Sequence, residues 1–311
     1  MRLFHNILFV SHGSARDEPA LKEALFLAHK EHAQLTILLV GPAFPDLFQE
    51  QQSSYEAFLI EKTLATINNL NAELSHHSLS PPTIEILWDN TPSIRIIQHV
   101  LMNHYDLLIK AAENTSQKRG FKALDMALLR KCPCTLYLHR PFKNKQKIHI
   151  AAAVSTEFEN QTGHDLSLSL LKLGQMLTQS YDGDFCVISC WDYVLESFMR
   201  RSAFIDINNQ DIDTRVTETQ NEHYLKLHEL MTEAKLKVQV NTMHLKGDPI
   251  ELIPHTVAQQ DIDILVMGTV ARTGLSGFII GNTAENILQQ VSCSLWSIKP
   301  QGFVCPVTLD K

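Results

Sequence analysis

The chain carries one pattern of apolar runs and turn residues twice, and this duplication constrains its fold more than any other feature. Pro92 and Pro249 lie 157 positions apart, and so do Asp106 and Asp263, each of which opens an apolar run. A repeat of this length indicates two copies of one domain. The 311 residues leave room for two domains of ordinary size, each with its own core.

Within each half, short apolar runs alternate with longer segments of helical periodicity. This alternation is typical of βαβ units, in which helices cover both faces of a parallel sheet. The predicted strands are 6–11, 34–40, 82–88, 105–111 and 135–139, then 148–155, 184–190, 237–245, 261–268 and 294–299. The predicted helices are 19–33, part of 53–73, and 92–103, then 165–179, 214–234, 249–259 and 282–291. We therefore expect an α/β fold of two tandem five-stranded parallel-sheet domains.

The boundary between the copies falls in a short basic and polar stretch. Residues 141–147 read as a linker, which places the first domain at 1–141 and the second at 148–300. The last residues, 301–311, form a C-terminal tail. Residues 193–210 show no clear periodicity and are expected to be irregular.

Composition narrows the function classes. The net charge is -7 and the pI is about 6.1, so the basic excess of a nucleic-acid-binding surface is missing. No run approaches 18 uninterrupted apolar residues, and the first ten residues are too interrupted for a secretory signal. Six cysteines in a chain of 311 residues are too few to indicate a disulfide framework. We expect a cytoplasmic protein with reduced thiols that binds neither nucleic acid nor membrane.

A glycine-rich loop in the second half is the strongest candidate for chemistry. It runs from Gly268 through Arg272 and Gly274 to Gly281, between a predicted strand and a predicted helix. Loops beyond the carboxyl ends of parallel strands bind ligands, and glycines let the backbone approach them closely. The start of the next helix offers free N–H groups to a phosphate, and Arg272 adds a positive charge.

The same helix start has a purely structural interpretation. Asn282 and Glu285 stand at the spacing of a capping box, in which side chains satisfy the first N–H groups of their own helix. An anion at this position then has to compete with Glu285. Ligand binding and self-capping both remain open here.

The spacing within this loop resembles a known motif. The pattern Gly268-x2-Ala271-x9-Gly281-Asn282 resembles the nucleotide loop of the universal stress protein family, Gly-x2-Gly-x9-Gly-(Ser/Thr). The repeated five-strand pattern of its tandem-domain members covers nearly the whole chain. The resemblance implies the adenine nucleotide alpha hydrolase-like fold, a cytoplasmic stress-response role and no established turnover chemistry.

The sequence departs from the nucleotide-binding members in three places. Ala271 stands where they have glycine. They carry an aspartate at the end of the first strand, where this chain has His12 in one copy and Ser155 in the other. The loop at 111–120 of the first copy has one glycine and a carboxylate, which is no phosphate cradle. The resemblance therefore places ligand binding in the second domain alone.

Other constellations indicate structure rather than chemistry. His12-Gly13-Ser14 reads as a turn, because no carboxylate is placed to orient a catalytic histidine. The pairs Cys132/Cys134 and Cys186/Cys190 lack the spacing of a zinc site, so no metal site is expected. We predict no catalytic residues.

The fifth strands, 135–139 and 294–299, are expected at the sheet edges, which favour pairing. Single-domain members of the family dimerise through this strand. The resemblance thus implies an intramolecular pseudo-dimer, with further homo-oligomers left open.

The sequence predicts a regulatory or protective factor that binds a small ligand in its second domain. The ligand is an adenine nucleotide, ATP with Mg, or an apolar, acyl-bearing molecule. A weak ATPase with Arg272 on the phosphates and a ligand-free protein-interaction module are the alternatives. The candidate binding residues are Ser155, Gly268, Ala271, Arg272, Gly274, Gly281, Asn282 and Thr283.

Overall fold

The fold is a single ten-stranded sheet made of two copies of one five-stranded unit. The computed structural model describes residues 3–74, 81–113, 119–142, 146–158, 160–201, 208–269 and 280–309. The strand order is β3-β2-β1-β4-β5-β10-β9-β6-β7-β8. Neighbouring strands are parallel within each half, as the alternation of strands and helices predicts.

The first copy begins near the N-terminus and ends at the linker. Its strands are β1 (Asn6–Ser11), β2 (Gln34–Gly41), β3 (Thr83–Trp88), β4 (Leu107–Ala111) and β5 (Thr135–His139). Its helices are α1 (Glu18–Glu31), α2 (Gln49–Glu73), α3 (Pro92–Asn103) and α4 (Ala123–Lys131), with short 3-10 turns at Ala15–Asp17 and Asp46–Phe48.

The second copy repeats this order. Its strands are β6 (His149–Ala153), β7 (Asp184–Trp191), β8 (Val240–Lys246), β9 (Ile264–Gly268) and β10 (Ser294–Ile298). Its helices are α5 (Gln161–Tyr181), α6 (Glu196–Arg201), α7 (Asn209–Glu233), α8 (Pro249–Gln259) and α9 (Asn282–Leu288). The predicted strands are confirmed within a few residues. The sequence reading missed α4, and it was wrong to treat all of 193–210 as irregular, because α6 lies there and α7 starts at Asn209.

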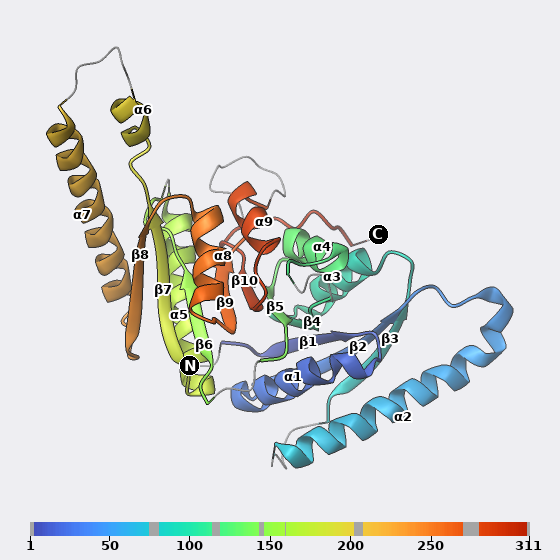
Figure 1. Ribbon diagram of the computed structural model, residues 1–311. Helices are drawn as coiled ribbons and strands as arrows, with labels where there is room; N and C mark the ends of the chain where they lie inside the picture. The colour runs from blue at the N-terminus through green and yellow to red at the C-terminus, as the bar shows by residue number, and fades with distance from the viewer. Residues whose placement is uncertain are drawn as a thin grey trace.

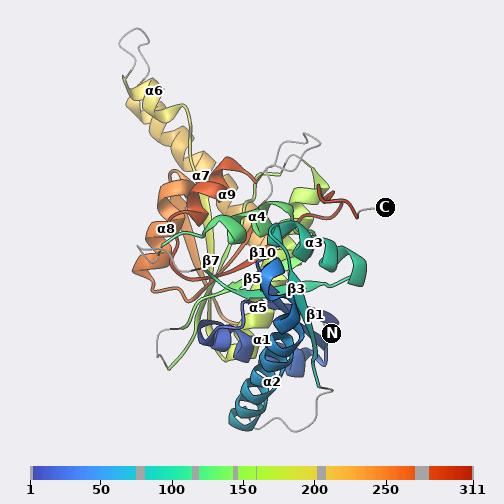
Figure 2. The same ribbon diagram turned by 90° about the vertical axis from the view of Figure 1, so that its right-hand side faces the viewer.

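Helices cover both faces of the sheet. Apolar side chains of α1, α2, α5 and α7 pack on one face, and those of α3, α4, α8 and α9 pack on the other. Figures 1 and 2 show α2 at one end of the molecule and α7 with α6 at the other, both reaching past the sheet. The central strands are buried on both sides and read as apolar runs, whereas the edge strands β3 and β8 are largely half-buried and carry polar residues.

The two copies join through their fifth strands. β5 and β10 pair antiparallel, with Tyr137 opposite Trp296. Their rings stack with centroids 4.5 Å apart, and both side chains are fully buried. This is the intramolecular pairing that the edge position of these strands predicts. It places the carboxyl end of β10 beside the start of β5, so the second domain's loops contact the first domain's α4.

Candidate functional site

The candidate site lies at the carboxyl ends of two neighbouring strands of the second domain. β6 and β9 are adjacent and parallel, with Ala153 opposite Met267, so the residues that follow each strand emerge at one edge. Five of the predicted site residues lie there: Ser155, Gly268, Gly281, Asn282 and Thr283. Ala271, Arg272 and Gly274 lie outside the described residues.

Gly268, the last residue of β9, is a packing glycine. A Cβ built on it comes within 2.8 Å of Leu166 Cδ2 on α5. The missing side chain therefore lets α5 lie close to β9, and the role of Gly268 in ligand binding stays a prediction.

The N-cap position of helix α9 lies one residue earlier than the predicted capping box requires. Gly281 is the N-cap, it makes no side-chain cap bond, and its N–H donates to the Thr269 carbonyl at 3.1 Å. Asn282 and Thr283 are exposed in the first turn. The capping box of Asn282 and Glu285 is thus wrong. Glu285 instead forms an ion pair with Arg130 of α4, which draws its carboxylate away from the first N–H groups of α9.

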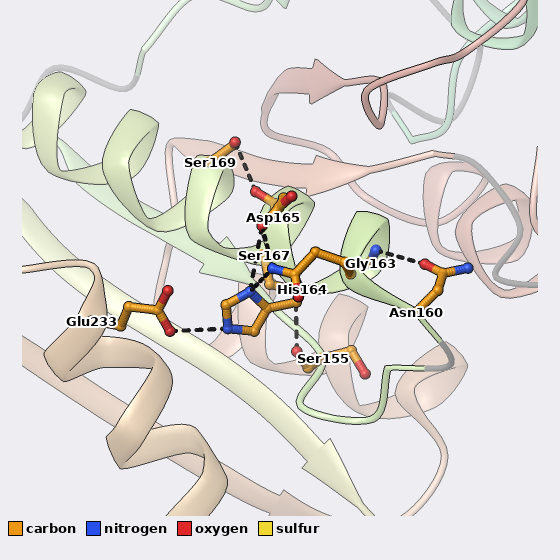
Figure 3. A network of polar contacts seen from close by, with 9 residues as sticks. Ser155, Asn160, Gly163, His164, Asp165, Ser167, Ser169 and Glu233 are labelled. Carbon is orange, nitrogen blue, oxygen red and sulfur yellow. Dashed lines mark hydrogen bonds and ion pairs between the residues drawn. The ribbon is translucent and has the colours of Figure 1, made fainter.

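Ser155 is half-buried just beyond β6 and uses its polar groups in a local turn. Its hydroxyl accepts the N–H of Glu157 at 3.1 Å, and its carbonyl accepts the hydroxyl of Ser167 at 3.1 Å. Figure 3 shows Ser155 and Ser167 joined in this way next to His164 at the start of α5. Ser155 therefore shapes the turn at the edge of the candidate site, and its role in ligand binding stays a prediction.

A cavity of about 670 Å³ opens directly beside this turn. Its lining comes from the β6–α5 connection and from the end of α7: Thr156, Glu157, Phe158, His164, Lys226, Glu229, Leu230 and Glu233. The volume is in the range of small-molecule sites. His164 Nε2 lies 3.0 Å from a Glu233 carboxylate oxygen and fastens α5 to α7 across the cavity (Figure 3).

Sequence reasoning missed this cavity. The run Thr156-Glu157-Phe158 follows a predicted strand, and this position beyond a strand end is a local signal that sequence reasoning could have used. No local signal shows the contribution of α7, because Glu233 is 69 positions from His164.

Lys299 is a second residue that sequence reasoning missed. It follows β10, and its ammonium donates to the Leu129 carbonyl of α4 and to the Thr269 hydroxyl, the latter at 2.6 Å. Burial lowers the pKa of Lys299 to about 8. The Thr269 hydroxyl also lies 3.2 Å from that of Ser297. These contacts fix the hydroxyl of Thr269, the first residue after β9.

The first domain fills the equivalent positions with its own carboxylates. At the end of β1, Asp17 is buried and accepts the Ser11 hydroxyl at 2.7 Å and the His12 N–H at 2.9 Å. The His12 ring lies 3.0 Å from the Val40 carbonyl, so it faces a backbone oxygen, in agreement with a turn.

After β4, Asp125 is held by an ion pair and by a backbone hydrogen bond. It lies in the first turn of α4, is fully buried, and pairs with buried Lys110 at 3.0 Å. It also accepts the Glu113 N–H at 2.8 Å. Burial raises the pKa of Asp125, and the nearby Lys110 ammonium opposes that effect. The one glycine of this loop, Gly120, has φ +70° and donates its N–H to Val291 of the second domain.

The cysteines and the described acidic and histidine side chains do not gather into a metal site. All six cysteines are free thiols. Burial raises the pKa of Cys186 and Cys190 to about 11, so both stay protonated and pack as small apolar groups. In the part of the chain that the structure describes, we find no group of three or more metal-binding side chains and no helix long and apolar enough to cross a membrane.

Comparison with known proteins places this geometry in a family. The family model "Universal stress protein family" matches residues 3–140 and again residues 162–299. Universal stress protein E of Photorhabdus laumondii is 27% identical over all of both chains, and that of Escherichia coli K12 is 26% identical over all of this chain and 98% of its own.

Solved structures show the same fold at lower identity. A Pseudomonas aeruginosa PAO1 protein described as functionally unknown superposes with a TM-score of 0.71 at 22% identity, over 96% of this chain and 94% of its own. A universal stress protein of Archaeoglobus fulgidus has a TM-score of 0.58 at 13% identity, over 94% and 98%. With two matches that together span most of its length, the chain belongs to the universal stress protein family and consists of two such domains in tandem.

Proposed function

We propose that this protein is a regulatory or protective stress-response factor that binds one small ligand in its second domain and does not turn it over. The observation that carries this proposal is the asymmetry between equivalent strand ends in the two domains. Buried Asp17 and Asp125 lie beyond the ends of β1 and β4 in the first domain, whereas a cavity of about 670 Å³ opens beside the end of β6 in the second. The ion pair with Arg130 holds Glu285 aside.

The favoured ligand is an adenine nucleotide with Mg. Free N–H groups at the start of α9, together with the glycine-bearing loop before it, suit a phosphate. The cavity beside β6 has the volume and the polar lining to suit the nucleoside end of such a molecule. Glu157, Glu229 and Glu233 would repel phosphates, but their carboxylates accept hydrogen bonds from sugar hydroxyls and from an amino group. Because this lining is largely polar, it favours a nucleotide over an acyl chain.

The test compares Gly281→Val with Lys122→Val, which changes the N-cap of the equivalent helix in the first domain. Thermal unfolding is recorded with and without ATP and Mg, and native mass spectrometry is used to count bound ligand. We expect the parent chain and Lys122→Val to be stabilised and to carry one nucleotide. Gly281→Val should lose both effects, because its side chain blocks approach to the backbone.

Other outcomes would replace the proposal. No thermal shift and no adduct in the parent chain would exclude the nucleotide. A co-purified apolar mass would favour the acyl-bearing ligand. Steady release of phosphate that Arg272→Ala abolishes would show an ATPase. Retained affinity in Gly281→Val would show that the site lies elsewhere.

A further inference from the structure

Two cysteines of the first domain lie in contact where α4 gives way to β5. Cys132 is the C-cap of α4 and is fully buried, and Cys134 is half-buried directly before β5. Their sulfur atoms lie 3.5 Å apart, within hydrogen-bond distance. A disulfide bond is about 2.05 Å long, so a closing movement of about 1.5 Å would join these sulfurs.

The two cysteines differ in their access to small molecules. Cys134 lines a cavity of about 430 Å³ at the amino ends of β4 and β5, together with His104, Tyr105 and Asp106. Cys132 lies behind it with none of its surface exposed. A small oxidant that enters the cavity therefore meets Cys134 first, and Cys132 is the second thiol.

The surroundings of the two thiols favour ionisation of the inner one. A hydrogen bond from the Cys134 thiol lowers the pKa of Cys132, burial opposes this effect, and the Cys134 N–H and the Lys299 ammonium add to the lowering. The hydrogen bond to Cys132, burial and the Asp106 carboxylate raise the pKa of Cys134. Cys132 is therefore the first of the two to ionise, and its thiolate can take the proton of Cys134.

The second domain has a cysteine at the equivalent position but not the second sulfur. Cys293 precedes β10 as Cys134 precedes β5, and Val291 stands where the first domain has Cys132. Burial raises the pKa of Cys293 to about 12, so this thiol stays protonated. The comparison gives the chain an internal control for the pair at the end of α4.

We propose that Cys132 and Cys134 form a reversible thiol-oxidation site that takes hydrogen peroxide. The Cys134 sulfur attacks one peroxide oxygen, its proton passes to the Cys132 thiolate, and the other oxygen leaves as hydroxide. The Cys132 sulfur then attacks the sulfenic acid on Cys134, and the hydroxyl group that it displaces takes the Cys132 proton and leaves as water. Each sulfur has lost one electron, and the peroxide has become one hydroxide and one water. A dithiol reductant reverses the disulfide by exchange.

The test treats the folded full chain with hydrogen peroxide, without any ligand, so it does not depend on the proposed function. The thiols that remain are alkylated after unfolding and mapped by mass spectrometry. Trypsin releases both cysteines in one peptide, 132–143, which lies between two lysines. We expect a disulfide within this peptide, restored to two thiols by dithiothreitol, whereas Cys190 and Cys293 should remain open to alkylation.

Variants separate the two steps. Cys134→Ser should leave Cys132 as a thiol. Cys132→Ala should leave a sulfenic acid on Cys134 that dimedone traps, formed more slowly than the parent disulfide because the base is missing. The matched control is Cys190→Ser, which removes another half-buried thiol and should leave the disulfide and its rate of formation unchanged.

The parent chain alone can overturn the proposal, whether or not the variants fold. Six alkylated thiols after peroxide treatment would do so. So would a disulfide from either cysteine to Cys305, whose sulfur lies 3.2 Å from the Lys131 carbonyl oxygen and is the nearest rival partner along this end of α4. In that case trypsin would release peptide 132–143 joined to the C-terminal peptide, in place of a disulfide within one peptide.

Discussion

The two domains share one topology but differ at the carboxyl ends of their strands. In the first domain, buried Asp17 lies just beyond β1, and Asp125 pairs with buried Lys110 beyond β4. In the second, the end of β6 borders a cavity, and Glu285 pairs with Arg130 of the other domain. The comparison shows that two copies of one topology can use acidic side chains differently, for a buried pair inside one copy and for a contact between domains in the other.

The first domain also contacts the second domain beside the candidate site. Its α4 reaches the ends of the other copy's loop through Leu129 and Arg130, and its Gly120 packs against the backbone at Gln289.

The largest expected effect comes from breaking the buried ion pair between Lys110 and Asp125 in the first domain. Asp125→Asn leaves the Lys110 ammonium buried without a counter-charge and should lower the free energy of unfolding by about 3–5 kcal/mol. Replacing both residues, by Lys110→Met and Asp125→Leu, should restore most of this loss, because an apolar pair needs no desolvation. Urea unfolding at pH 7 measures both.

The matched control is Asp184→Asn, which breaks the exposed pair with Lys147 and should cost less than about 1 kcal/mol. An equal cost for Asp125→Asn and Asp184→Asn would show that the buried pair of Asp125 stabilises the first domain no more than an exposed pair does.

The next effect concerns the glycine that the first domain's loop retains. Gly120→Ala should cost about 2–3 kcal/mol, because φ is +70° and a Cβ would lie 2.6 Å from the Gln289 carbonyl oxygen. Gly13 has the same φ, but its Cβ would meet only a Leu59 methyl at 3.4 Å. Gly13→Ala should therefore cost only about 1 kcal/mol, from backbone strain alone. Equal unfolding free energies for the two variants would show that Gly120 makes no critical contact with the second domain.

A smaller and pH-dependent effect lies on the other face of the domain contact. Glu23 of α1 accepts the Tyr181 hydroxyl of α5, and burial raises its pKa to about 7. Its carboxyl in the unfolded chain titrates near 4.5, so the folded protein keeps a proton that the unfolded chain loses. The contribution of Glu23 to the free energy of unfolding should be fully present below pH 4.5 and be lost as the pH rises to 7.

Glu23→Gln should remove this dependence and be the more stable protein at pH 8, by on the order of 1 to 3 kcal/mol. Urea unfolding between pH 4.5 and 8 measures the difference. Glu73→Gln, on exposed α2, should keep the parent's pH profile. If Glu23→Gln shows the parent's profile too, the domain contact contains no titrating carboxyl at this position.

The smallest effect tests the packing of Gly268 against Leu166. Gly268→Ala should cost less than about 1 kcal/mol, because the added Cβ meets the flexible end of Leu166. It should leave ligand binding intact, in contrast to Gly281→Val. Calorimetric titration with the ligand found by native mass spectrometry compares the two. Loss of affinity in Gly268→Ala with normal stability would return this glycine to the ligand site.

The central strands could be predicted from the sequence because each is an apolar run buried on both faces. The half-buried edge strands β3 and β8 were found because they recur at the same place in each copy. Helix α4 was missed because its nine residues include Asp125, Arg130 and Lys131, which interrupt a short apolar pattern. Asp125, one of the polar residues that interrupt this pattern, is the residue whose buried carboxylate pairs with Lys110.

The candidate site was less predictable, because its decisive contacts cross between domains. Nothing local to Glu285 shows that Arg130, 155 positions away, draws its carboxylate from the helix start. Lys299 is likewise joined to Leu129 across 170 positions. Spacing rules describe one element at a time, and the capping box proved wrong because tertiary pairing overrode it.

Hydrogen exchange of the intact chain, with and without saturating ATP and Mg, tests most directly whether only the second domain accepts a ligand. The account predicts slower exchange in peptides covering 153–164 and 266–288, and no change in those covering 9–17 and 110–126. Slower exchange at 110–126 would contradict the account, because the carboxylate of Asp125 would then leave room for a ligand. No change in either domain would contradict it as well.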